Sequence, residues 1–574
     1  MNGALRRALP PLQWLRGYDR QTLASDALAA VIVTIMLIPQ SLAYALLAGL
    51  PAEMGLYASI LPLLAYALFG SSRTLSVGPV AVVSLMTATA VGKVAASGSL
   101  GYASAAIAMA LLSGAMLIGM GLLRFGQLAN LLSHPVVSGF ITASGVIIAL
   151  SQLRHIFGVS AHGETLPALL ATLAAHLGDS NGTTLATGIA ALVFLFWVRS
   201  GLAPLLQRLG VGAASAGMIA KGGPVLVIVA TIAASVLLDY EARGVALVGA
   251  VPRGLPALAL PAIDLALWRE LAVSALLISV IGFVESVSVG KTLAAKRRQR
   301  IDADQELLAL GAANVASSLS GGFPVTGGFS RSVVNFDAGA QTQLASVLAA
   351  LGIALAALLF TPVLYHLPKA TLAATIIVAV TSLIDLQLVR TAWRFSRTDF
   401  TAVTVTIAVT LLAGVELGVL AGIAVSVALH LYKTSRPHIA IVGAVPGTEH
   451  YRNVERHAVI TYPNIVSLRI DESLFFANAG FMESAVYALI AEHGERLQHV
   501  ILQCTAVNEI DLSALEALEA IDERLREQGI RLHLSEVKGP VMDALKRSDF
   551  LQHLSGQVFL SQHQACEALK PAEA

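Results

Sequence analysis

The sequence predicts a polytopic α-helical membrane protein followed by a small cytosolic α/β domain. Of its 574 residues, 56% are hydrophobic and only 13% are charged, whereas soluble chains average about a quarter charged residues. Residues 94–123, 341–365 and 400–415 contain almost no charge, and a bilayer span needs roughly 20 apolar residues. After Arg436 the composition changes, because charged residues become frequent.

The apolar runs are continuous and do not alternate, which indicates membrane helices and not a β-barrel. A soluble protein of this composition would need many fully buried helices in one core. The formal net charge of +1 gives no indication of nucleic acid binding. Both cysteines, Cys504 and Cys566, fall in the polar C-terminal part, which argues against a disulfide scaffold and fits a reducing compartment.

Clusters of basic residues predict how the chain is oriented. The N-terminus is basic but lacks a cleavage site after a short apolar core, so no cleaved signal peptide is expected. Further clusters occur at residues 296–300, 390–397 and 433–436. The positive-inside rule places them in the cytoplasm. Both termini are then cytoplasmic, and the number of crossings is even.

Strand and helix patterns alternate after residue 436. Residues 464–470, 499–504 and 531–537 read as short buried strands, and residues 514–528 have helical spacing with charges on one face. This alternation predicts an α/β domain. The expected organisation is a cytosolic segment at 1–20, a transport domain at 21–436 and a cytosolic domain at 437–574.

The membrane part shows weak internal symmetry. Residues 37–50 align with 282–295, which places Gln40 opposite Glu285, and a second alignment places Gly78 opposite Gly328. Two alignments at nearly one offset predict repeats of about 21–240 and 262–436; chance similarity between apolar segments is the alternative. Repeats in transporters commonly carry the substrate site where they meet, on helices broken by Gly or Pro.

The stretch FPVTGGFSRSVVNFDAG, residues 323–339, breaks such an apolar segment. A helix that begins near Phe329 or Ser330 directs free N–H groups and its positive dipole end at whatever lies ahead, which favours an anion. Ser330 and Ser332 add hydroxyl donors, and Arg331 adds a planar charged fork suited to an oxyanion. Alternatively, Arg331 lies at a loop end and extends to the headgroups.

The other repeat offers matching features. Gly78 and Pro79 are expected to start a second half-helix, with Pro79 at its first helical position. Glu285 stands in an uncharged run, where a carboxylate is costly and is a functional candidate, here for proton coupling. A structural ion pair with Arg331 is the alternative. Gln40 and Tyr44 lie one turn apart on one face; they contact substrate, or else a neighbouring helix.

No catalytic constellation is recognised. The sequence has no GxxxxGKS/T loop that would cradle a phosphate and no metal-ligand spacing. We therefore expect no enzyme activity, no metal and no cofactor.

Three segments resemble the signatures of the sulfate permease (SulP) family, which includes plant sulfate transporters and the animal anion exchangers related to prestin. They are PAEMGLYASILPLLAYALFGSSR, SVGPVAVVSL and GGFSRSVVNFDAGAQTQLA, in that order. The resemblance implies fourteen spans in two inverted repeats of seven, a core domain that moves against a gate domain, a C-terminal STAS domain and a homodimer.

The resemblance also implies where the substrate binds, namely between the half-helices of spans 3 and 10. The matching positions, with those of span 1, are Gln40, Tyr44, Pro79, Val80, Ala81, Phe329, Ser330, Arg331 and Ser332. The acidic residue on span 8 of proton-coupled members matches Glu285.

The sequence departs from the family pattern at three positions. Met54 replaces an aromatic residue, and Val80 replaces the phenylalanine of several animal members, which implies a roomier pocket. Leu512 occupies the position that is a phosphorylated serine in STAS-related antagonists, and Ser513 follows it. Ser513 is therefore a regulatory candidate, while regulation on the antagonist pattern is doubtful.

The resulting hypothesis is proton-coupled uptake of an oxyanion, foremost sulfate, across a bacterial inner membrane. Bicarbonate or a dicarboxylate, and anion exchange or sodium coupling, remain open. A nucleobase carrier would not need Arg331. Other classes are an anion channel or a sensor built on the STAS domain. The expected partners are a small anion, protons, the bilayer, a second copy of the chain and cytosolic partners of the STAS domain, but no nucleic acid.

Overall fold

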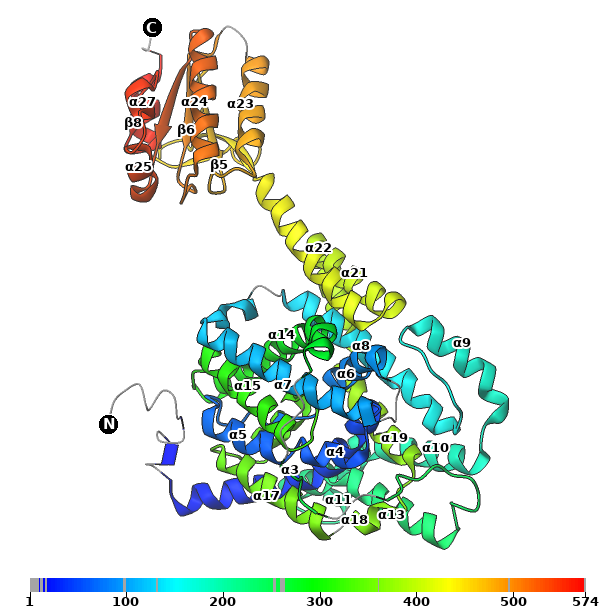
Figure 1. Cartoon of the computed structure of the whole chain (residues 1–574). Coiled ribbons are helices and arrows are strands. Elements are labelled where there is room, and N and C mark those ends of the chain that lie inside the picture. Colours follow the sequence, from blue (N-terminus) through cyan, green and yellow to red (C-terminus); the bar gives the residue numbers. More distant parts are fainter. Residues whose placement is uncertain are drawn as a thin grey trace. The chain divides into compact units, whose positions relative to one another are not determined.

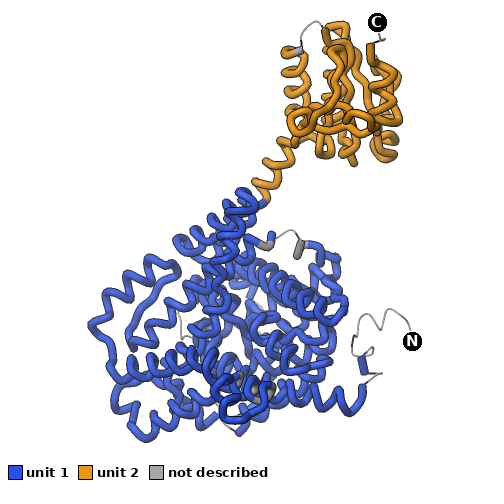
Figure 2. The backbone as a smooth tube through the Cα atoms, turned by 180° about the vertical axis from the view of Figure 1, so that it is seen from behind, with its two compact units in different colours: residues 1–426 blue, residues 427–574 orange. Residues whose placement is uncertain are grey.

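The computed structural model describes residues 10, 14–15, 18–95, 100–130, 133–250, 254–258, 264–359, 361–493 and 496–571. The chain forms two compact units, Met1–Ser426 and Val427–Ala574 (Figure 2). Most of the expected N-terminal cytosolic segment, residues 1–20, lies outside the described residues.

Seven membrane elements of the first unit precede residue 240. They are α3 (Arg20–Leu47), α4 (Ala52–Tyr57) with α5 (Leu61–Phe69), β1 (Val77–Gly78) with α6 (Ala81–Val94), α7 (Leu100–Leu122), α8 (His134–Phe157), α10 (Gly182–Trp197) and α13 (Gly223–Leu237) (Figure 1).

Seven more follow, and in each set of seven the third element is a short strand followed by a helix. They are α14 (Leu265–Lys296), α15 (Ala303–Leu319), β2 (Thr326–Gly327) with α16 (Phe329–Asp337), α17 (Leu344–Leu359), α19 (Lys369–Val380), α21 (Arg397–Ala413) and α22 (Val415–Ser435). The predicted 7+7 helical architecture is confirmed.

Short helices connect these elements. They are η2 (Phe125–Asn130), α9 (Leu166–His176), η3 (Leu177–Asp179), η4 (Val198–Leu202), α11 (Ala203–Arg208), α12 (Ala213–Lys221), α18 (Thr361–Leu364), η5 (Thr381–Leu383) and α20 (Leu386–Phe395). Of these, η4 is a π-helix that continues α10, a rare element that is frequent at functional sites.

The helices of the first unit pack as two groups, each built from corresponding elements of both repeats. In the first group, α15 packs on α7 and α5, and α17 packs on α3. In the second group, α19 packs on α10 and α8, and α21 packs on α8. We call α3–α7 with α14–α17 the first group and α8–α13 with α18–α22 the second group.

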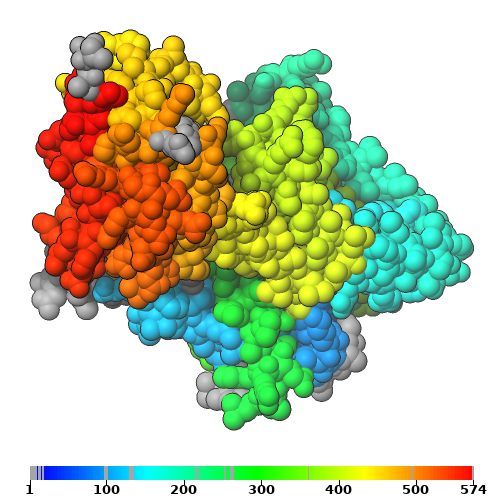
Figure 3. Space-filling view, turned by 90° about the horizontal axis from the view of Figure 1, so that it is seen from above, coloured from blue at the N-terminus to red at the C-terminus, as the bar shows by residue number. Residues whose placement is uncertain are grey.

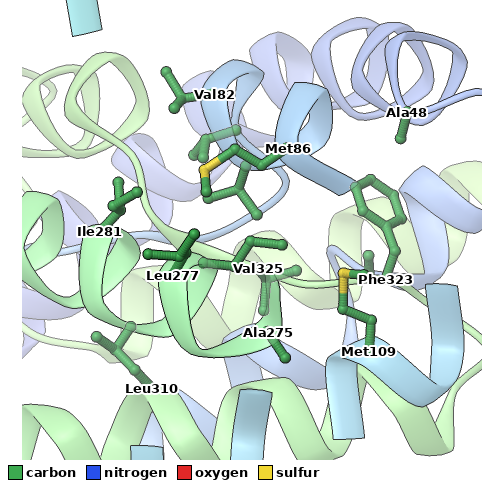
Figure 4. Close-up of a cluster of buried hydrophobic side chains, with 14 of the residues drawn as sticks. Ala48, Val82, Met86, Met109, Ala275, Leu277, Ile281, Leu310, Phe323 and Val325 are labelled. Carbon is green, nitrogen blue, oxygen red and sulfur yellow. The ribbon is translucent and has the colours of Figure 1, made fainter. Parts of the chain in front are cut away.

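The interior of the first group is apolar and holds the broken segments in place. Met86 of α6, Met109 of α7 and Leu277 of α14 are buried together with Phe323 and Val325, which precede β2 (Figure 4). The strands β1 and β2 pair antiparallel, with Gly78 opposite Thr326. The two interrupted segments, about 250 residues apart in the chain, are therefore direct neighbours.

Side-chain amides satisfy the backbone groups that the interruptions expose. Asn314 donates to the carbonyl of Val325 (2.8 Å) and accepts from its N–H (2.9 Å). Gln343 donates to the carbonyls of Ser72 and Leu75, at 2.8 Å each. Buried backbone groups need such partners where no water is present, so these two amides stabilise the breaks.

The second unit is the predicted α/β domain. Its sheet has the order β4-β3-β5-β6-β7-β8, in which β5 to β8 are parallel and β3 is antiparallel to β4 and β5. The strands are β3 (Ile439–Ala444), β4 (Tyr451–Asn453), β5 (Ile465–Ile470), β6 (His499–Gln503), β7 (Arg531–Ser535) and β8 (Val558–Phe559). The helices are α23 (Ala479–His493), α24 (Leu512–Glu527), α25 (Gly539–Leu545), α26 (Phe550–His553) and α27 (Gln562–Leu569).

The helix α24 follows from its sequence. Asp511 caps it by accepting the N–H of Ala514 at 2.9 Å, as an N-cap aspartate does. Leu518, Ile521 and Leu525 are buried along one face at helical spacing. Ser513, the regulatory candidate, is exposed in the first turn, so it is accessible in this unit.

Candidate functional site

Two half-helices begin at the centre of the first unit. The first backbone N–H that donates within α16 is that of Ser332, to the carbonyl of Gly328 at 3.1 Å; in α6 it is that of Ser84, to the carbonyl of Val80 at 2.9 Å. In each helix, the three N–H groups before it have no intrahelical acceptor. Both helices thus carry a partial positive charge at this end.

Pro79 does not have the role expected of it. The helix α6 begins at Ala81 with Val80 as its N-cap, so Pro79 lies before the helix and not at its first position. Its carbonyl accepts a hydrogen bond from Nη2 of Arg331 at 2.6 Å. Pro79 therefore connects the first repeat to the arginine of the second.

The helix starts line a small pocket. Eight of the ten predicted residues line it: Gln40, Tyr44, Val80, Ala81, Glu285, Phe329, Ser330 and Arg331. Pro79 and Ser332 do not. Val82, Gly328, Ala379, Val380 and Leu383 complete the lining.

The three residues from α19 and η5 bring the second group into the pocket wall. Ala379, Val380 and Leu383 were missed from the sequence because small and aliphatic residues within an apolar helix carry no distinguishing signal. The pocket thus lies between the two groups of helices.

Arg331 is fully buried, with 2% of its surface exposed. Its Nη2 donates to Pro79, but its Nη1 has no hydrogen-bond partner in the described part of the chain. A buried guanidinium nitrogen without an acceptor is costly. An anion in the pocket would supply the missing acceptor.

Gly78 leaves the space that the guanidinium occupies. A Cβ at this position would lie 1.9 Å from Nη1 of Arg331, closer than any real contact. Glycine is therefore required at position 78 because the backbone of β1 passes directly against the arginine.

Glu285 lies on α14 and is 8% exposed. Its Oε2 has no hydrogen-bond partner among the described residues, and within them no ion pair joins Glu285 to Arg331. The alternative of a structural ion pair is therefore not observed in this conformation. The carboxyl group faces the same pocket as the arginine without neutralising it.

The remaining predicted residues divide into two kinds. The Gln40 amide and the Tyr44 hydroxyl line the pocket, and no hydrogen bond joins either to a described residue. Ser332 is buried and accepts the backbone N–H of Ser76 at 3.0 Å. Its hydroxyl oxygen therefore ties α16 to the segment that leads into β1, and the residue lies outside the lining of the pocket.

A wider cavity adjoins the pocket, because Gln40, Ser330 and Ala379 line both. We call it the vestibule. Leu195 of α10, Pro224 of α13 and residues of η4, α11 and α12 form much of its wall. An anion could reach the two helix ends through it.

Arg199 of η4 is the charged residue among the described ones that line the vestibule. Its Nη1 donates to Oγ1 of Thr381 at 3.2 Å, which holds the guanidinium against η5. Arg199 was not predicted from the sequence, although an arginine directly after an apolar helix could have indicated it.

A second buried carboxylate, Glu306 on α15, was also missed. It accepts hydrogen bonds from the Tyr66 hydroxyl (2.7 Å), the Ser71 N–H (2.8 Å) and hydroxyl (2.7 Å), and the Ser72 N–H (3.1 Å). These four donors satisfy it, and they fix the turn between α5 and β1. Glu306 is therefore structural.

No group of three or more His, Cys, Asp or Glu side chains that could hold a metal ion occurs within the described ranges. The charged residues that line the pocket are Arg331 and Glu285.

Curated proteins are similar to this chain over nearly its whole length. Sulfate transporter 4.1, chloroplastic, of Arabidopsis thaliana is 34% identical over 96% of this chain and 80% of its own length. Probable sulfate transporter MT1781 of Mycobacterium tuberculosis is 32% identical over 98% of both chains.

Solved structures share the fold. That titled as murine Slc26a9 in the inward-facing state superposes with a TM-score of 0.88 at 24% identity, over 99% of this chain and 95% of the other. The transmembrane domain titled as that of the cyanobacterial bicarbonate transporter BicA gives a TM-score of 0.59 at 21% identity, over 71% of this chain and 98% of the other.

Two family models match the chain and together cover most of it. Residues 457–565, which lie within the α/β unit, match the STAS domain. Residues 23–406 match the sulfate permease family. The chain therefore belongs to the sulfate permease family and carries a C-terminal STAS domain.

Proposed function

We propose that this protein is a secondary active transporter, and not an enzyme, that takes up sulfate together with a proton. The observation that carries the proposal is the pair of unsatisfied groups in one pocket: Nη1 of Arg331 lacks an acceptor and Oε2 of Glu285 lacks any partner. Structural groups at this depth would be paired. Both relatives described above are named as sulfate transporters, which supports the choice of anion.

The charges of the pocket give the proton its role. Sulfate carries −2 and Arg331 carries +1, which leaves −1 when Glu285 is protonated and −2 when it is ionised. Because like charges repel strongly in a medium of low dielectric constant, sulfate binding favours the protonated carboxyl group. The N–H groups at the starts of α6 and α16 then stabilise the remaining negative charge.

The arrangement of the two helix groups supports alternating access. The first group carries the half-helices, Arg331 and Glu285, and the second group supplies Ala379 to the facing wall of the pocket. We infer that the first group acts as the core that carries the anion and that the second group acts as the gate.

The two sides of the pocket differ in a way that fits an inward-facing state. The vestibule, which has Arg199 in its lining, lies on one side. Elsewhere, Lys93 of α6 forms an ion pair with Glu416 of α22, which also accepts from the Ser274 hydroxyl at 2.6 Å. This contact joins the first group to the second. We propose that it lies on the closed, outer side, with both termini in the cytoplasm of a bacterium and two chains forming a dimer.

The test is uptake of radiolabelled sulfate by the purified protein in proteoliposomes, with and without an inward proton gradient. We expect uptake that saturates with sulfate and is driven by the gradient. Uptake driven equally by a sodium gradient, or flux that does not saturate, would contradict proton symport. Bicarbonate or a dicarboxylate that outcompetes sulfate would reassign the substrate.

A further inference from the structure

A second site for anions lies in the C-terminal unit, remote in sequence from the transport pocket. An open hollow is lined by His438, Arg452, Asn453, Arg456, His457, Arg469 and Asp471. These residues come from the start of β3, from β4 and the turn after it, and from the end of β5. This segment, yellow to amber in Figure 3, lies on the surface seen in that view.

The single carboxylate in the lining is already engaged. Arg469 donates to both oxygens of Asp471, at 2.6 Å from Nε and 3.1 Å from Nη2, and His438 Nδ1 lies 2.8 Å from the same carboxylate. Asp471 therefore holds Arg469 and His438 in fixed positions. It neutralises one positive charge of the hollow.

Two arginines in the lining remain free to bind a ligand. The guanidinium groups of Arg452 and Arg456 have no hydrogen-bond or ion-pair partner among the residues that the structure describes, and both side chains are exposed. With three arginines and one aspartate, the lining carries a formal charge of +2 before any histidine is protonated. Glu455 stands between them in sequence but does not line the hollow.

The chemistry of this lining selects an oxyanion group. Guanidinium groups donate in a planar fork that fits phosphate, often through two parallel hydrogen bonds. The Asn453 amide adds a neutral polar group to the lining. A phosphate group can face Arg452 and Arg456 together, while Arg469 contributes charge from the floor of the hollow.

The position of the hollow along the chain indicates the source of the phosphate. The last membrane helix, α22, ends at Ser435, and His438 follows three residues later, within about 10 Å of extended chain. Near this end, Tyr432 is 59% exposed and Arg436 lies over its ring. Exposed aromatic residues next to basic ones are typical of the headgroup level of a bilayer.

We propose that this hollow binds the headgroup phosphate of an anionic phospholipid from the leaflet at which α22 ends. Basic segments directly after a membrane helix attract such lipids, and here the charge is gathered in a hollow of fixed shape. The site would anchor β3, β4 and β5 to the membrane surface. The proposal requires only that α22 spans the bilayer, and it is independent of which anion is transported.

The test is hydrogen exchange of the full-length protein in nanodiscs of phosphatidylcholine with increasing phosphatidylglycerol. We expect the amides of residues 451–457 to exchange more slowly as phosphatidylglycerol increases. In the double variant Arg452→Gln/Arg456→Gln, most of this protection should be lost at every fraction of phosphatidylglycerol, because the two guanidinium groups that would hold the phosphate are absent.

The matched control is Arg496→Gln/Arg547→Gln, which removes the same charge from the same unit outside the hollow. Protection that persists in the control supports the site, whereas equal loss in both variants would mean a diffuse surface effect and overturn it. Protection by millimolar inorganic phosphate without phosphatidylglycerol would overturn the lipid assignment. Unchanged protection in Arg452→Gln/Arg456→Gln would overturn the proposal. Because the readout is local exchange, a failed sulfate assay does not affect it.

Discussion

Two buried glutamates of the membrane unit have opposite surroundings. Glu306 accepts hydrogen bonds from four donors that fix the turn between α5 and β1. Glu285 lies on the wall of the central pocket, and its Oε2 has no partner in the described structure. Both side chains are at least nine-tenths buried, so burial alone does not distinguish them.

The difference separates structural groups from groups that await a ligand. A buried charge is tolerated when it is paired and hydrogen-bonded, and is costly otherwise. The satisfied Glu306 therefore stabilises the fold, whereas the unpaired Oε2 of Glu285 and Nη1 of Arg331 lower stability. In the proposed mechanism, an anion and a proton relieve this cost. Substitutions at the two places should have opposite effects on stability and on binding.

The largest effect is expected for Arg331→Ala. Loss of the guanidinium should weaken sulfate binding more than about tenfold, since a charge-assisted contact contributes roughly 1.5–3 kcal/mol. Thermal stability without sulfate should stay the same or rise, because an unsatisfied buried donor disappears. Binding calorimetry and thermal unfolding of one purified sample measure both; wild-type affinity would show that the arginine does not bind the anion.

Gly78→Ala should weaken binding through Arg331 without removing any charge. The added Cβ would lie 1.9 Å from Nη1, so the guanidinium must move away from Pro79. We expect an affinity loss of about tenfold, comparable with one charge-assisted contact. Gly92→Ala is the control, because a Cβ on Gly92, in the helix α6 that follows β1, meets no atom within 4 Å. If Gly78→Ala and Gly92→Ala bind sulfate with equal affinity, β1 does not pack tightly against Arg331.

Glu306→Gln should give the reverse result. The amide NH2 of the glutamine would face hydrogen-bond donors at a place where a carboxylate oxygen accepts their hydrogen bonds in the wild type. We therefore expect the free energy of unfolding to fall by about 1–3 kcal/mol. The affinity of the folded fraction for sulfate should not change. Thermal unfolding and sulfate binding should be measured for Glu306→Gln and Arg331→Ala side by side. If Glu306→Gln is stable but binds sulfate weakly, Glu306 belongs to the site.

The C-terminal unit provides a further buried group that must stay neutral. Burial, with nearby His499 and Arg531, lowers the pKa of His533 to about 4, and its Nδ1 accepts the Gln557 N–H at 3.1 Å. Because the unfolded chain takes up a proton near the ordinary pKa of about 6.5, stability is present above that pH and is lost as the pH falls toward 4.

By this linkage, the C-terminal unit should be less stable at pH 5 than at pH 7 by about 1–2 kcal/mol. Hydrogen exchange of the β7 amides, corrected for the intrinsic effect of pH, measures the change. In His533→Asn the difference between the two pH values should shrink. A difference that persists unchanged would assign it to other groups.

The sequence predicted those parts that depend on local pattern. The interruption around Gly328 and the start of α16 at Phe329 follow from glycines and a helix start in an apolar run. The strands β5, β6 and β7 follow from short apolar segments. Pro79 was placed wrongly at the first position of α6. Because β1 pairs with β2, Pro79 and Val80 both stay outside the helix, which begins at Ala81.

Contacts between distant segments could not be read from the sequence. Glu306 has the same appearance in the sequence as any glutamate in a first helical turn, and its four donors come from α5 and the turn after it. Likewise, Ala379, Val380 and Leu383 reach the pocket only because α19 packs against α3 and α8. Which buried carboxylate is satisfied is a property of the packing, and only the structure reveals it.

The most direct test of the central claim, that Glu285 is unsatisfied because it carries the transported proton, compares two assays on Glu285→Gln in proteoliposomes. Glutamine mimics the protonated carboxyl group permanently, while Arg331 and the helix ends remain intact. We predict that uptake driven by a proton gradient disappears, because the protein cannot return empty and deprotonated, and that exchange of sulfate for sulfate persists. Gradient-driven uptake at the wild-type rate would contradict the claim.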